Sequence, residues 1–564
     1  MTNPFPDSFS RIVSDDGQRL SWRAHVILIL LCLAFFLPGL NAIPPVDRDE
    51  PLFAQATKQM IETGNYADIR FQEEARYKKP IGIYWLQAAS VKLFSPDKPN
   101  SIWAYRVPSL IGATIGVVMT AVLGAIFFGP MAGFLAGLMM ASCLLLNVEA
   151  RLAKTDAALL ACVMVAQYAL ARAYKSRDAS QKPGWPVVLS FWTAQALGFL
   201  IKGPILLLVT VLTLAGLRLS GTRLKWFKFL RPAWGLPYAL AMVLPWFLLI
   251  SLSSQGAFIA EAAGHDMLAK IWQGQLRGIM PPGLHALVFP VAFFPASLFA
   301  LLAIPDVWRK RREPEVRFLL CWIAPLWLLF EISLTKLPHY LLPAYPAIAI
   351  LAARVLRDGM PYMTSHRYFT KSALALWLFI GFIGVVFTIG APRVIEDVWS
   401  PVALLTALVL TSMLIAIGIL IQQRPLDGAL VMIPLTLLYV ALFFGTVLPS
   451  LNRLWLAQNV VSVAHAVKPC GELRLVSASY NEPSLTFLAG RETRYLYDGD
   501  VAAKMLMKDR CLMALVDQDH ERAFMETFKD PDIQPLDMAL LEGPNIGNGI
   551  LLRLTLYRMM ETGK

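Results

Sequence analysis

Long apolar runs separated by short polar connections dominate this chain. The first run extends from His25 to Leu40 and is followed by further runs whose lengths suit membrane-crossing helices of roughly 20 residues. The later runs lie near residues 106–127, 130–147, 155–174, 186–201, 204–218, 235–253, 284–304, 316–334, 338–356, 372–390, 400–421 and 428–448. The pattern predicts an α-helical polytopic membrane protein with about 13 transmembrane helices, in which the first run is a retained span and not a cleaved signal peptide.

Three polar segments are longer than a simple connection needs: residues 44–105, 254–284 and 450–564. In the first, Asp49-Glu50-Pro51 is typical of a helix start with an acidic cap, and Gly64 of a helix end. The apolar stripe between them predicts an amphipathic helix on the membrane surface, and a second such helix is expected over 81–93.

The last of these segments has short alternating stretches, such as 473–477 and 551–556, with helical stretches between them. We therefore predict three parts: an N-terminal segment at 1–23, a membrane domain at 24–449 and a small α/β domain at 450–564. Cys470 and Cys511 lie in the last part, where an oxidising compartment would allow them to pair. The sequence alone leaves that pairing open.

Composition and charge agree with a membrane protein and set its orientation. Hydrophobic residues make up 56% of the chain, charged residues 16% and the net charge is +12, whereas soluble domains carry roughly 25% charged residues. Cationic clusters recur in alternate loops, which predicts a cytoplasmic N-terminus and a periplasmic C-terminal domain. These clusters lie at 175–182, 218–231, 309–317 and 354–371. The charge excess then reflects contact with anionic lipid, and no nucleic-acid partner is expected.

Acidic residues near the outer membrane surface are the first candidates for chemistry. Asp47 and Asp49 follow the first span, and Asp156 begins the run at 155–174. A carboxylate at a helix entrance can serve only as a cap. Several acids on one side of the membrane, amid outward-facing cations, instead indicate a functional site.

The cations at the outer ends of the predicted spans are the second group. Their placement runs against the positive-inside trend, which suggests an anionic ligand such as a lipid-linked phosphate, although interfacial anchoring is the alternative for any single residue. The group comprises Lys78, Lys79, Arg106, Lys202 and Lys336, and Tyr340 lies close to Lys336 in sequence. His265 and His339 are further candidates, but no metal-binding or nucleotide-binding motif is present, and a metal site, with His265 as a weak candidate ligand, stays open.

Several motifs occur together in an order that resembles one family. They are Asp49-Glu50, Tyr77-Lys78-Lys79-Pro80, Lys202-Gly203-Pro204, Thr335-Lys336-Leu337-Pro338-His339-Tyr340 and Tyr480-Asn481-Glu482-Pro483-Ser484. The chain resembles bacterial aminoarabinose transferases of the protein O-mannosyltransferase superfamily, which have a GT-C fold. The resemblance extends over nearly the whole chain and depends on the order of the motifs, because each motif alone is weak.

The resemblance implies an integral membrane glycosyltransferase of the inner membrane. It would move a sugar from a polyprenyl-phosphate donor to lipid A or protein on the periplasmic face, with inversion at the anomeric carbon. Asp49 and Asp156 would be the catalytic acids, with Glu50, His265 and His339 as candidate acceptor-site residues. The donor phosphate would be held by Lys78, Lys79, Arg106, Lys202, Lys336 and Tyr340.

The chain also departs from that family. Where the family has Glu before the lysine of the Lys-Pro motif, this chain has Lys78, which removes an acidic metal ligand and makes a bound metal doubtful. The family's Arg after the Asp-Glu pair is absent, since Leu52 and Phe53 occupy that stretch. The sugar, the acceptor and the prenyl length therefore stay open. The main alternative is a transporter or flippase of lipid-linked saccharides, and a scaffold protein is the other.

Overall fold

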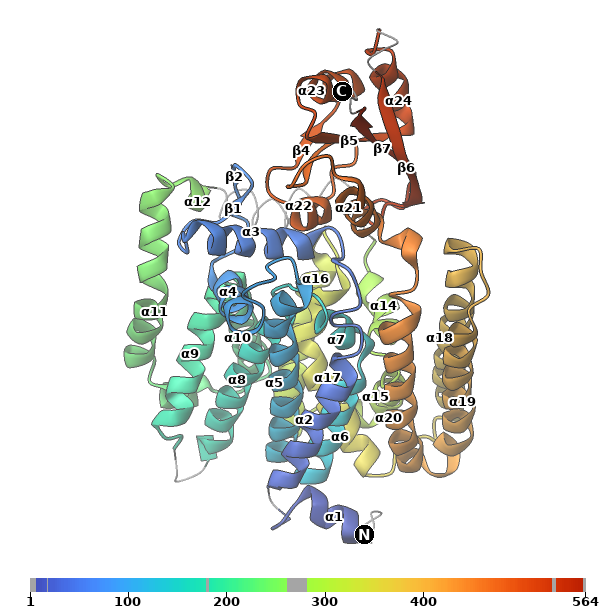
Figure 1. The fold of residues 1–564 in the computed structure, drawn as a ribbon. Coiled ribbons are helices and arrows are strands. Elements are labelled where there is room, and N and C mark those ends of the chain that lie inside the picture. Colours follow the sequence, from blue (N-terminus) through green and yellow to red (C-terminus); the bar gives the residue numbers. More distant parts are fainter. Residues whose placement is uncertain (1–6, 18, 179–181, 261–280, 530–533, 561–564) are drawn as a thin grey trace.

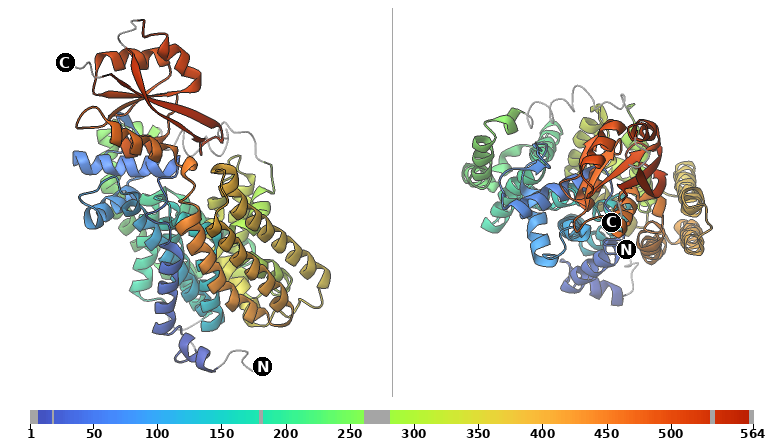
Figure 2. Two further views of the ribbon diagram at one scale, coloured as in Figure 1. Left: turned by 45° about the vertical axis from the view of Figure 1, so that its right-hand side comes forward. Right: turned by 45° about the horizontal axis from the view of Figure 1, so that its top comes forward.

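The computed structural model describes residues 7–17, 19–178, 182–260, 281–529 and 534–560. A bundle of long helices forms one end of the molecule, and a smaller α/β domain lies on the other (Figure 1). The N-terminal helix α1 (Asp7–Val13) lies at the far end of the bundle from the α/β domain, as the rotated views also show (Figure 2). His265, one of the predicted site residues, lies outside the described residues.

Every apolar run predicted from the sequence falls on helical structure. Seven helical segments are long and apolar enough to cross a membrane by length and composition within the described part of the chain. The helices of the bundle are α2 (Trp22–Phe36), α5 (Ile102–Phe128), α6 (Pro130–Ser142), α8 (Asp156–Lys175), α9 (Trp185–Lys202), α10 (Ile205–Leu219), α11 (Pro232–Ser253), α15 (Ser297–Arg309), α16 (Pro314–Ile332), α17 (Tyr345–Arg357), α18 (Arg367–Ile395), α19 (Pro401–Gln423) and α20 (Pro425–Leu442). The multi-pass helical class is confirmed, and the number of spans stays a prediction.

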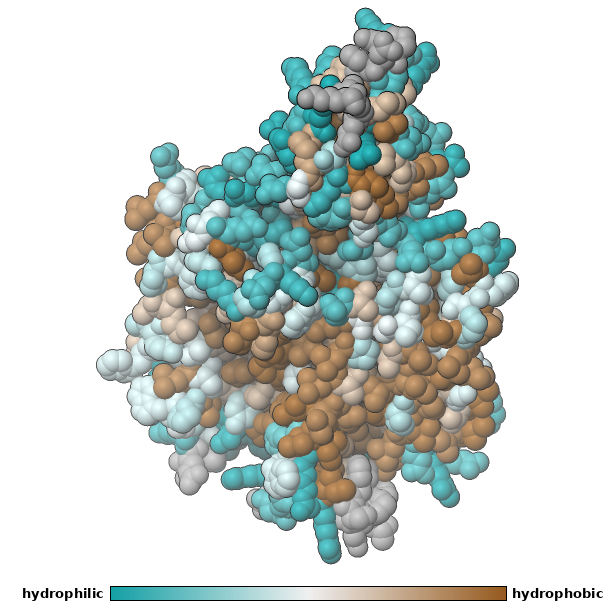
Figure 3. Space-filling view, viewed as in Figure 1, coloured by the Kyte–Doolittle hydropathy of each residue, from teal (hydrophilic) through white to brown (hydrophobic). Residues whose placement is uncertain are grey.

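The outer surface of the bundle is apolar. Figure 3 shows hydrophobic side chains over the helical part of the molecule and hydrophilic ones over the α/β domain. Helix α18, for example, exposes Phe379, Phe382 and Phe387, each by more than half. Such a surface is stable in lipid and not in water, so the chain is a multi-pass membrane protein.

Two of the predicted runs are interrupted, which the apolar pattern did not predict. The run at 130–147 divides into α6 and the short α7 (Leu144–Glu149), and the run at 284–304 divides into α14 (Leu284–Ala292) and α15. The two breaks meet, because the Leu144 N–H donates to the Phe294 carbonyl at 2.9 Å. Pro295 lacks an N–H and so favours a break there. Backbone groups freed at one break are thus bonded at the other, and α7 carries Glu149 to the end of the bundle.

Two helices of the first long loop cover the bundle beneath the α/β domain. The first, α3 (Asp49–Thr63), is followed by Gly64 in the left-handed conformation, as predicted, and the second, α4, covers Gly82–Phe94. Asp49 is the first helical residue and not the cap, which is Arg48 without a capping hydrogen bond, so the prediction of an acidic cap is wrong. Buried Lys58 of α3 donates to the Phe487 carbonyl of the α/β domain at 3.3 Å.

The α/β domain contains a mixed five-stranded sheet in the order β4-β3-β5-β7-β6, in which β3 pairs in parallel with β4 and β5 and the other pairs are antiparallel. A disulfide joins Cys470 and Cys511. The strands are β3 (Arg474–Ala478), β4 (Arg494–Leu496), β5 (Leu512–Asp517), β6 (Pro535–Pro544) and β7 (Leu551–Met559). The helices are α21 (Leu456–Val467), α22 (Pro483–Ala489), α23 (Gly499–Lys508) and α24 (Gln518–Met525).

Candidate active site

Several helix ends meet where the bundle faces the α/β domain, and each contributes an ionisable side chain. Asp156 begins α8, Lys202 ends α9 and Glu149 ends α7. His339 lies in the 3-10 helix η4 (Pro338–Ala344), which packs against both α7 and α8. Residues far apart in the sequence therefore come together because their helices end at the same level.

These side chains form one buried charge network. Lys202 Nζ donates to Asp156 Oδ1 at 2.5 Å, and His339 Nε2 lies 3.9 Å from the same oxygen. On the other side of the ring, His339 Nδ1 lies 3.7 Å from Glu149 Oε1, which also accepts from Lys154 Nζ at 3.2 Å. The histidine thus connects two carboxylate–lysine pairs, which hold one another in place in a region of low dielectric constant.

Lys154 and Glu149 are the two members of this network that were not predicted from the sequence, and Glu149 has the more unusual surroundings. Its Oε2 atom is buried and has no hydrogen-bond partner among the described residues. Burial raises the pKa of Glu149 above its usual value, with Lys154 opposing this and the nearby Asp156 charge acting in the same direction as burial. A buried acceptor atom without a partner, next to paired acids and bases, is typical of a binding or catalytic site. The sequence signal that could have identified Glu149 is its place as a carboxylate just after the apolar run at 130–147.

Asp49 is an exposed acid whose charge acts on the network. It is exposed at the first residue of α3, and its charge acts on Lys154 and His339. Asp156, by contrast, is buried and directly bonded to Lys202. The two acids thus have different environments: one is accessible to a substrate, and the other is enclosed by cations.

Glu50 and Arg106 form a separate, fully buried ion pair. Arg106 Nε donates to Glu50 Oε1 at 2.7 Å, and its Nη2 donates to Oε2 at 2.8 Å. The remaining N–H groups of the guanidinium donate to the carbonyls of Leu40, Ile43 and Pro44. All five guanidinium donors are thereby used.

This pair anchors the first loop to the bundle. Glu50 also accepts from the backbone N–H of Val46 at 2.9 Å and from that of Ala153 at 2.8 Å, which joins the start of α3 to the chain just before α8. The sequence analysis placed Arg106 among the ligands of a donor phosphate. Because the guanidinium has no donor left over, that prediction does not fit the structure, and we assign Arg106 the role of positioning α3 and its Asp49. Glu50 belongs to the same anchor and is not an acceptor-site residue in this arrangement.

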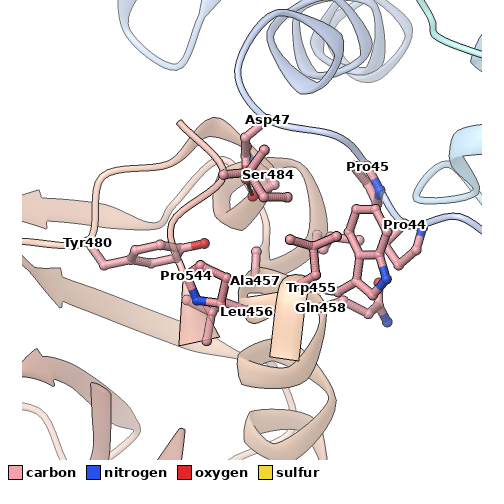
Figure 4. Close-up of a pocket in the computed structure, with 13 residues that line it drawn as sticks. Pro44, Pro45, Asp47, Trp455, Leu456, Ala457, Gln458, Tyr480, Ser484 and Pro544 are labelled. Atoms are coloured by element: carbon pink, nitrogen blue, oxygen red, sulfur yellow. Dashed lines mark hydrogen bonds between the residues drawn. The ribbon is translucent and has the colours of Figure 1, made fainter. Parts of the chain in front are cut away.

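Asp47 joins the first loop to the α/β domain. Its carboxylate accepts from the Ser484 N–H at 2.9 Å and from the Ser484 hydroxyl at 2.6 Å. The two residues line a small pocket together with Tyr480 and Trp455 (Figure 4). Asp47 is therefore engaged in docking the two parts of the molecule, which leaves Asp49 as the accessible acid of the pair.

The docking contact of Asp47 predicts a pH dependence. Burial raises the pKa of Asp47 to about 7, with Glu482 contributing and the Ser484 hydrogen bonds opposing. Since an unfolded Asp titrates near about 4, the stability contributed by neutral Asp47 is complete below that pH and is lost as the pH rises through about 7. In Asp47→Asn the amide oxygen accepts from the Ser484 N–H and the amide nitrogen donates to the Ser484 hydroxyl, without a titratable group. The fall of the denaturation midpoint between pH 5 and pH 8 should therefore be smaller in this variant than in wild type. Equal falls in the two proteins would contradict the assignment.

The remaining predicted cations differ in exposure and in the groups they contact. Lys202 Nζ lies 6.0 Å from the centre of the Tyr340 ring, so these two residues are brought together. Lys79 is half-buried and donates to the carbonyl of exposed Lys78 at 3.0 Å, and buried Lys336 donates to the Ser333 carbonyl at 2.7 Å. No group of three His, Cys, Asp or Glu side chains that could hold a metal occurs among the described residues.

Arg76 is a third residue that was not predicted from the sequence. Its buried guanidinium lies 4.8 Å from the centre of the Phe53 ring, and its Nη1 donates to the Tyr84 hydroxyl at 3.0 Å. No carboxylate pairs with it among the described residues. Phe53 lies one helical turn after Asp49, and Arg76 precedes Lys79 by three positions. A buried guanidinium without an acid at this place is suited to an anionic ligand.

The comparisons with known proteins bear on the fold. Residues 78–248 match the family model of dolichyl-phosphate-mannose-protein mannosyltransferases. The crystal structure of ArnT from Cupriavidus metallidurans bound to undecaprenyl phosphate superposes with a TM-score of 0.73 at 17% identity, over 95% of this chain and 98% of that one. The chain has the GT-C fold. The apo crystal structure of the same Cupriavidus ArnT superposes with the same TM-score of 0.73, over 94% of this chain and 97% of that one, at 18% identity.

The chain is also similar in sequence to bacterial arabinosyl transferases. The undecaprenyl phosphate-α-4-amino-4-deoxy-L-arabinose arabinosyl transferase 2 of Pseudomonas fluorescens is 25% identical over 344 residues, 60% of each chain. The corresponding transferase of Serratia proteamaculans is 26% identical over 372 residues, 63% of this chain and 62% of its own. The resemblance predicted from the motifs is thus confirmed, although the alignments cover only about three-fifths of these relatives.

Proposed function

We propose that this GT-C protein is a glycosyltransferase of the inner membrane that transfers a sugar from a polyprenyl phosphate to an envelope acceptor. The observation that carries the proposal is the meeting of an accessible acid, Asp49, with a buried carboxylate–lysine–histidine network at one end of the membrane bundle. The names of its relatives and the undecaprenyl phosphate in the related crystal structure support the choice of donor class.

The cations would bind the phosphate of the donor. Lys202, which is bonded to Asp156 and lies beside Tyr340, is the first candidate, and Lys79 and the planar guanidinium of Arg76 would join it. When the bond between the anomeric carbon and the phosphate oxygen breaks, its electron pair stays on the departing polyprenyl phosphate. Lysine and arginine side chains already in place stabilise that charge without reorganisation, which lowers the barrier.

The acid groups would act on the acceptor. If the acceptor is a hydroxyl, Asp49 takes its proton as the oxygen attacks the anomeric carbon from the face opposite the phosphate, which inverts that centre. If the acceptor is a phosphate such as that of lipid A, the oxygen is already anionic, and the site has mainly to position it. Asp156 would hold Lys202 and His339 in their orientations, and Lys336 would remain a donor-site candidate.

The proposed orientation places the network on the periplasmic side. Residues 1–23 would be cytoplasmic, the membrane domain would cover 24–449, and the α/β domain at 450–564 would be periplasmic, in line with the excess of Lys and Arg in alternate loops. A disulfide between Cys470 and Cys511 is compatible with that compartment. Lipid A-like or protein acceptors would then be accessible from the same side.

Arg76 provides a test of the donor-binding part of the proposal. Loss of a charge-assisted hydrogen bond to phosphate costs about 1.5–3 kcal/mol, so Arg76→Gln should lower kcat/KM for the donor roughly tenfold or more, through a higher KM and a lower kcat. Arg70→Gln is the matched control, because Arg70 lies in the same loop but is exposed and paired with Asp68. A loss of thermal stability with an unchanged donor KM would show that Arg76 is only a packing residue.

The activity itself is tested by a screen of purified protein. The enzyme would be incubated with undecaprenyl phosphates carrying aminoarabinose, hexoses or uronic acids, together with lipid A or envelope protein, and products would be identified by mass spectrometry. We expect transfer with at least one donor. Because Lys78 and Leu52 distinguish this chain from the family pattern, the preferred donor need not be aminoarabinose. Absence of transfer with every pair, from a preparation shown to bind undecaprenyl phosphate, would contradict the proposal.

A further inference from the structure

A cavity lined by cationic side chains lies at the opposite end of the membrane bundle from the candidate active site. It has a volume of about 550 Å³ and is formed by the end of α8, the 3-10 helices η1 (Ser176–Asp178) and η2 (Leu224–Leu230) and the start of α16. Asp156 begins α8 and Tyr174 lies in its last turn, so nearly the full length of this helix, about 30 Å, separates the two sites.

Positive charge dominates the lining of this cavity. The cationic side chains are Arg177, Lys182, Arg223, Lys225, Lys228 and Arg317, whereas the only acidic residue in the lining is Asp178. Arg177 already pairs with Asp178 at 3.0 Å. The exposed Arg223, Lys225 and Lys228 have no acidic partner among the described residues. The cavity therefore keeps a net positive charge that a bound anion would neutralise.

Two buried polar groups of the lining also lack partners. The hydroxyl of Thr222 and the indole N–H of Trp226 are both buried, and neither has a hydrogen-bond partner among the described residues. Buried donors of this kind are rare because leaving them unpaired costs free energy. Their position beside a ring of cations is suited to an oxygen-rich anion, which would accept from both.

We propose that this cavity binds the phosphate headgroup of an anionic glycerophospholipid from the leaflet on its side of the membrane. Its volume fits a headgroup and not a complete lipid, so the acyl chains would lie outside it. Leu219, at the end of α10, is 89% exposed three positions before Thr222, and offers an apolar surface for such chains. Exposed Trp185, with Arg231 over its ring at 3.9 Å, is typical of a residue at the lipid–water boundary.

The binding of defined lipids to the full-length protein tests this site. Delipidated protein in neutral detergent would be titrated with phosphatidylglycerol, with phosphatidylethanolamine or with inorganic phosphate, and binding would be followed by native mass spectrometry. We expect selective binding of phosphatidylglycerol that falls at least tenfold in the triple variant Arg223→Gln/Lys225→Gln/Lys228→Gln. The conservative changes Thr222→Val and Trp226→Phe should each weaken binding as well, because they remove only a donor group.

The matched control is the triple variant Arg309→Gln/Arg311→Gln/Arg312→Gln. It removes the same charge from another loop outside the cavity and should bind phosphatidylglycerol as wild type does. Equal loss in both triple variants would overturn the proposal in favour of general surface charge. Displacement of the lipid by inorganic phosphate at comparable concentrations would assign the cavity to a soluble anion and would overturn the lipid assignment. Because the readout is binding and not transfer, the result is independent of the proposed enzymatic activity.

Discussion

Replacing Asp49 by asparagine is expected to lower the rate of sugar transfer to a hydroxyl acceptor by about 10²–10⁴-fold, the usual contribution of a general base. The amide has nearly the same shape as the carboxylate but cannot take a proton. Asp49 is exposed, and within the described part of the chain it has no ion pair like that of Glu50 with Arg106, so folding should be unaffected. Donor binding, measured with undecaprenyl phosphate, should stay close to that of wild type.

Asp47→Asn is the matched control for this variant. Asp47 lies two positions away and has the same side chain, but it is bound to Ser484. It should retain most of the transfer activity. An Asp49→Asn protein that transfers sugar to a hydroxyl at the wild-type rate would exclude Asp49 as the base. Loss of activity in Asp47→Asn alone would move that role to Asp47.

Glu50→Gln is expected to destabilise the protein by about 3–5 kcal/mol, because it leaves the charge of Arg106 buried without its counterion. The Glu50 side chain is 1% exposed and that of Arg106 is fully buried, so water cannot replace the lost interaction. The variant should show a lower denaturation midpoint in detergent and a lower yield of folded protein. Unchanged stability would contradict the anchoring role.

A double variant separates the ion pair from the rest of the anchor. Glu50→Gln/Arg106→Met removes both charges, so its loss of stability should be smaller than the sum of the losses in the two single variants. The control is Lys504→Gln, which breaks an exposed pair with Asp500 in the α/β domain and should change stability by less than about 1 kcal/mol. Additive losses would indicate that Glu50 and Arg106 act through separate contacts.

The helical elements were largely predictable from local pattern. Apolar runs located the helices of the bundle because a membrane-spanning segment has to be apolar over its whole length. Gly64 marked the end of α3 correctly because its left-handed conformation suits glycine. The strands near 473–477 and 551–556 followed from alternation. What these signals share is that each depends only on neighbours in the sequence.

Features that depend on distant partners were not predictable. The breaks at Cys143 and Phe294 stabilise each other across the bundle, and neither run indicates that on its own. Arg106 was interpreted as a ligand of phosphate because its partners, Glu50 and three loop carbonyls, converge only in the folded chain. Glu149 and Arg76 were missed because what marks them is a missing partner. Among the described residues, Glu149 Oε2 has no hydrogen-bond partner and Arg76 has no carboxylate, and this is visible only in the folded chain. The resemblance to a family supplied the remaining candidates.

Sugar transfer is distinguished from flipping by following the sugar and the polyprenyl phosphate of the donor in one experiment. Undecaprenyl phosphate carrying a labelled sugar would be supplied to the protein in vesicles, and sugar and lipid would be traced separately by mass spectrometry. The proposed function predicts sugar on the acceptor and an equal amount of free undecaprenyl phosphate, with both abolished in Asp49→Asn for a hydroxyl acceptor. Intact donor that moves to the opposite leaflet without cleavage, at the same rate in Asp49→Asn, would contradict it and indicate a flippase.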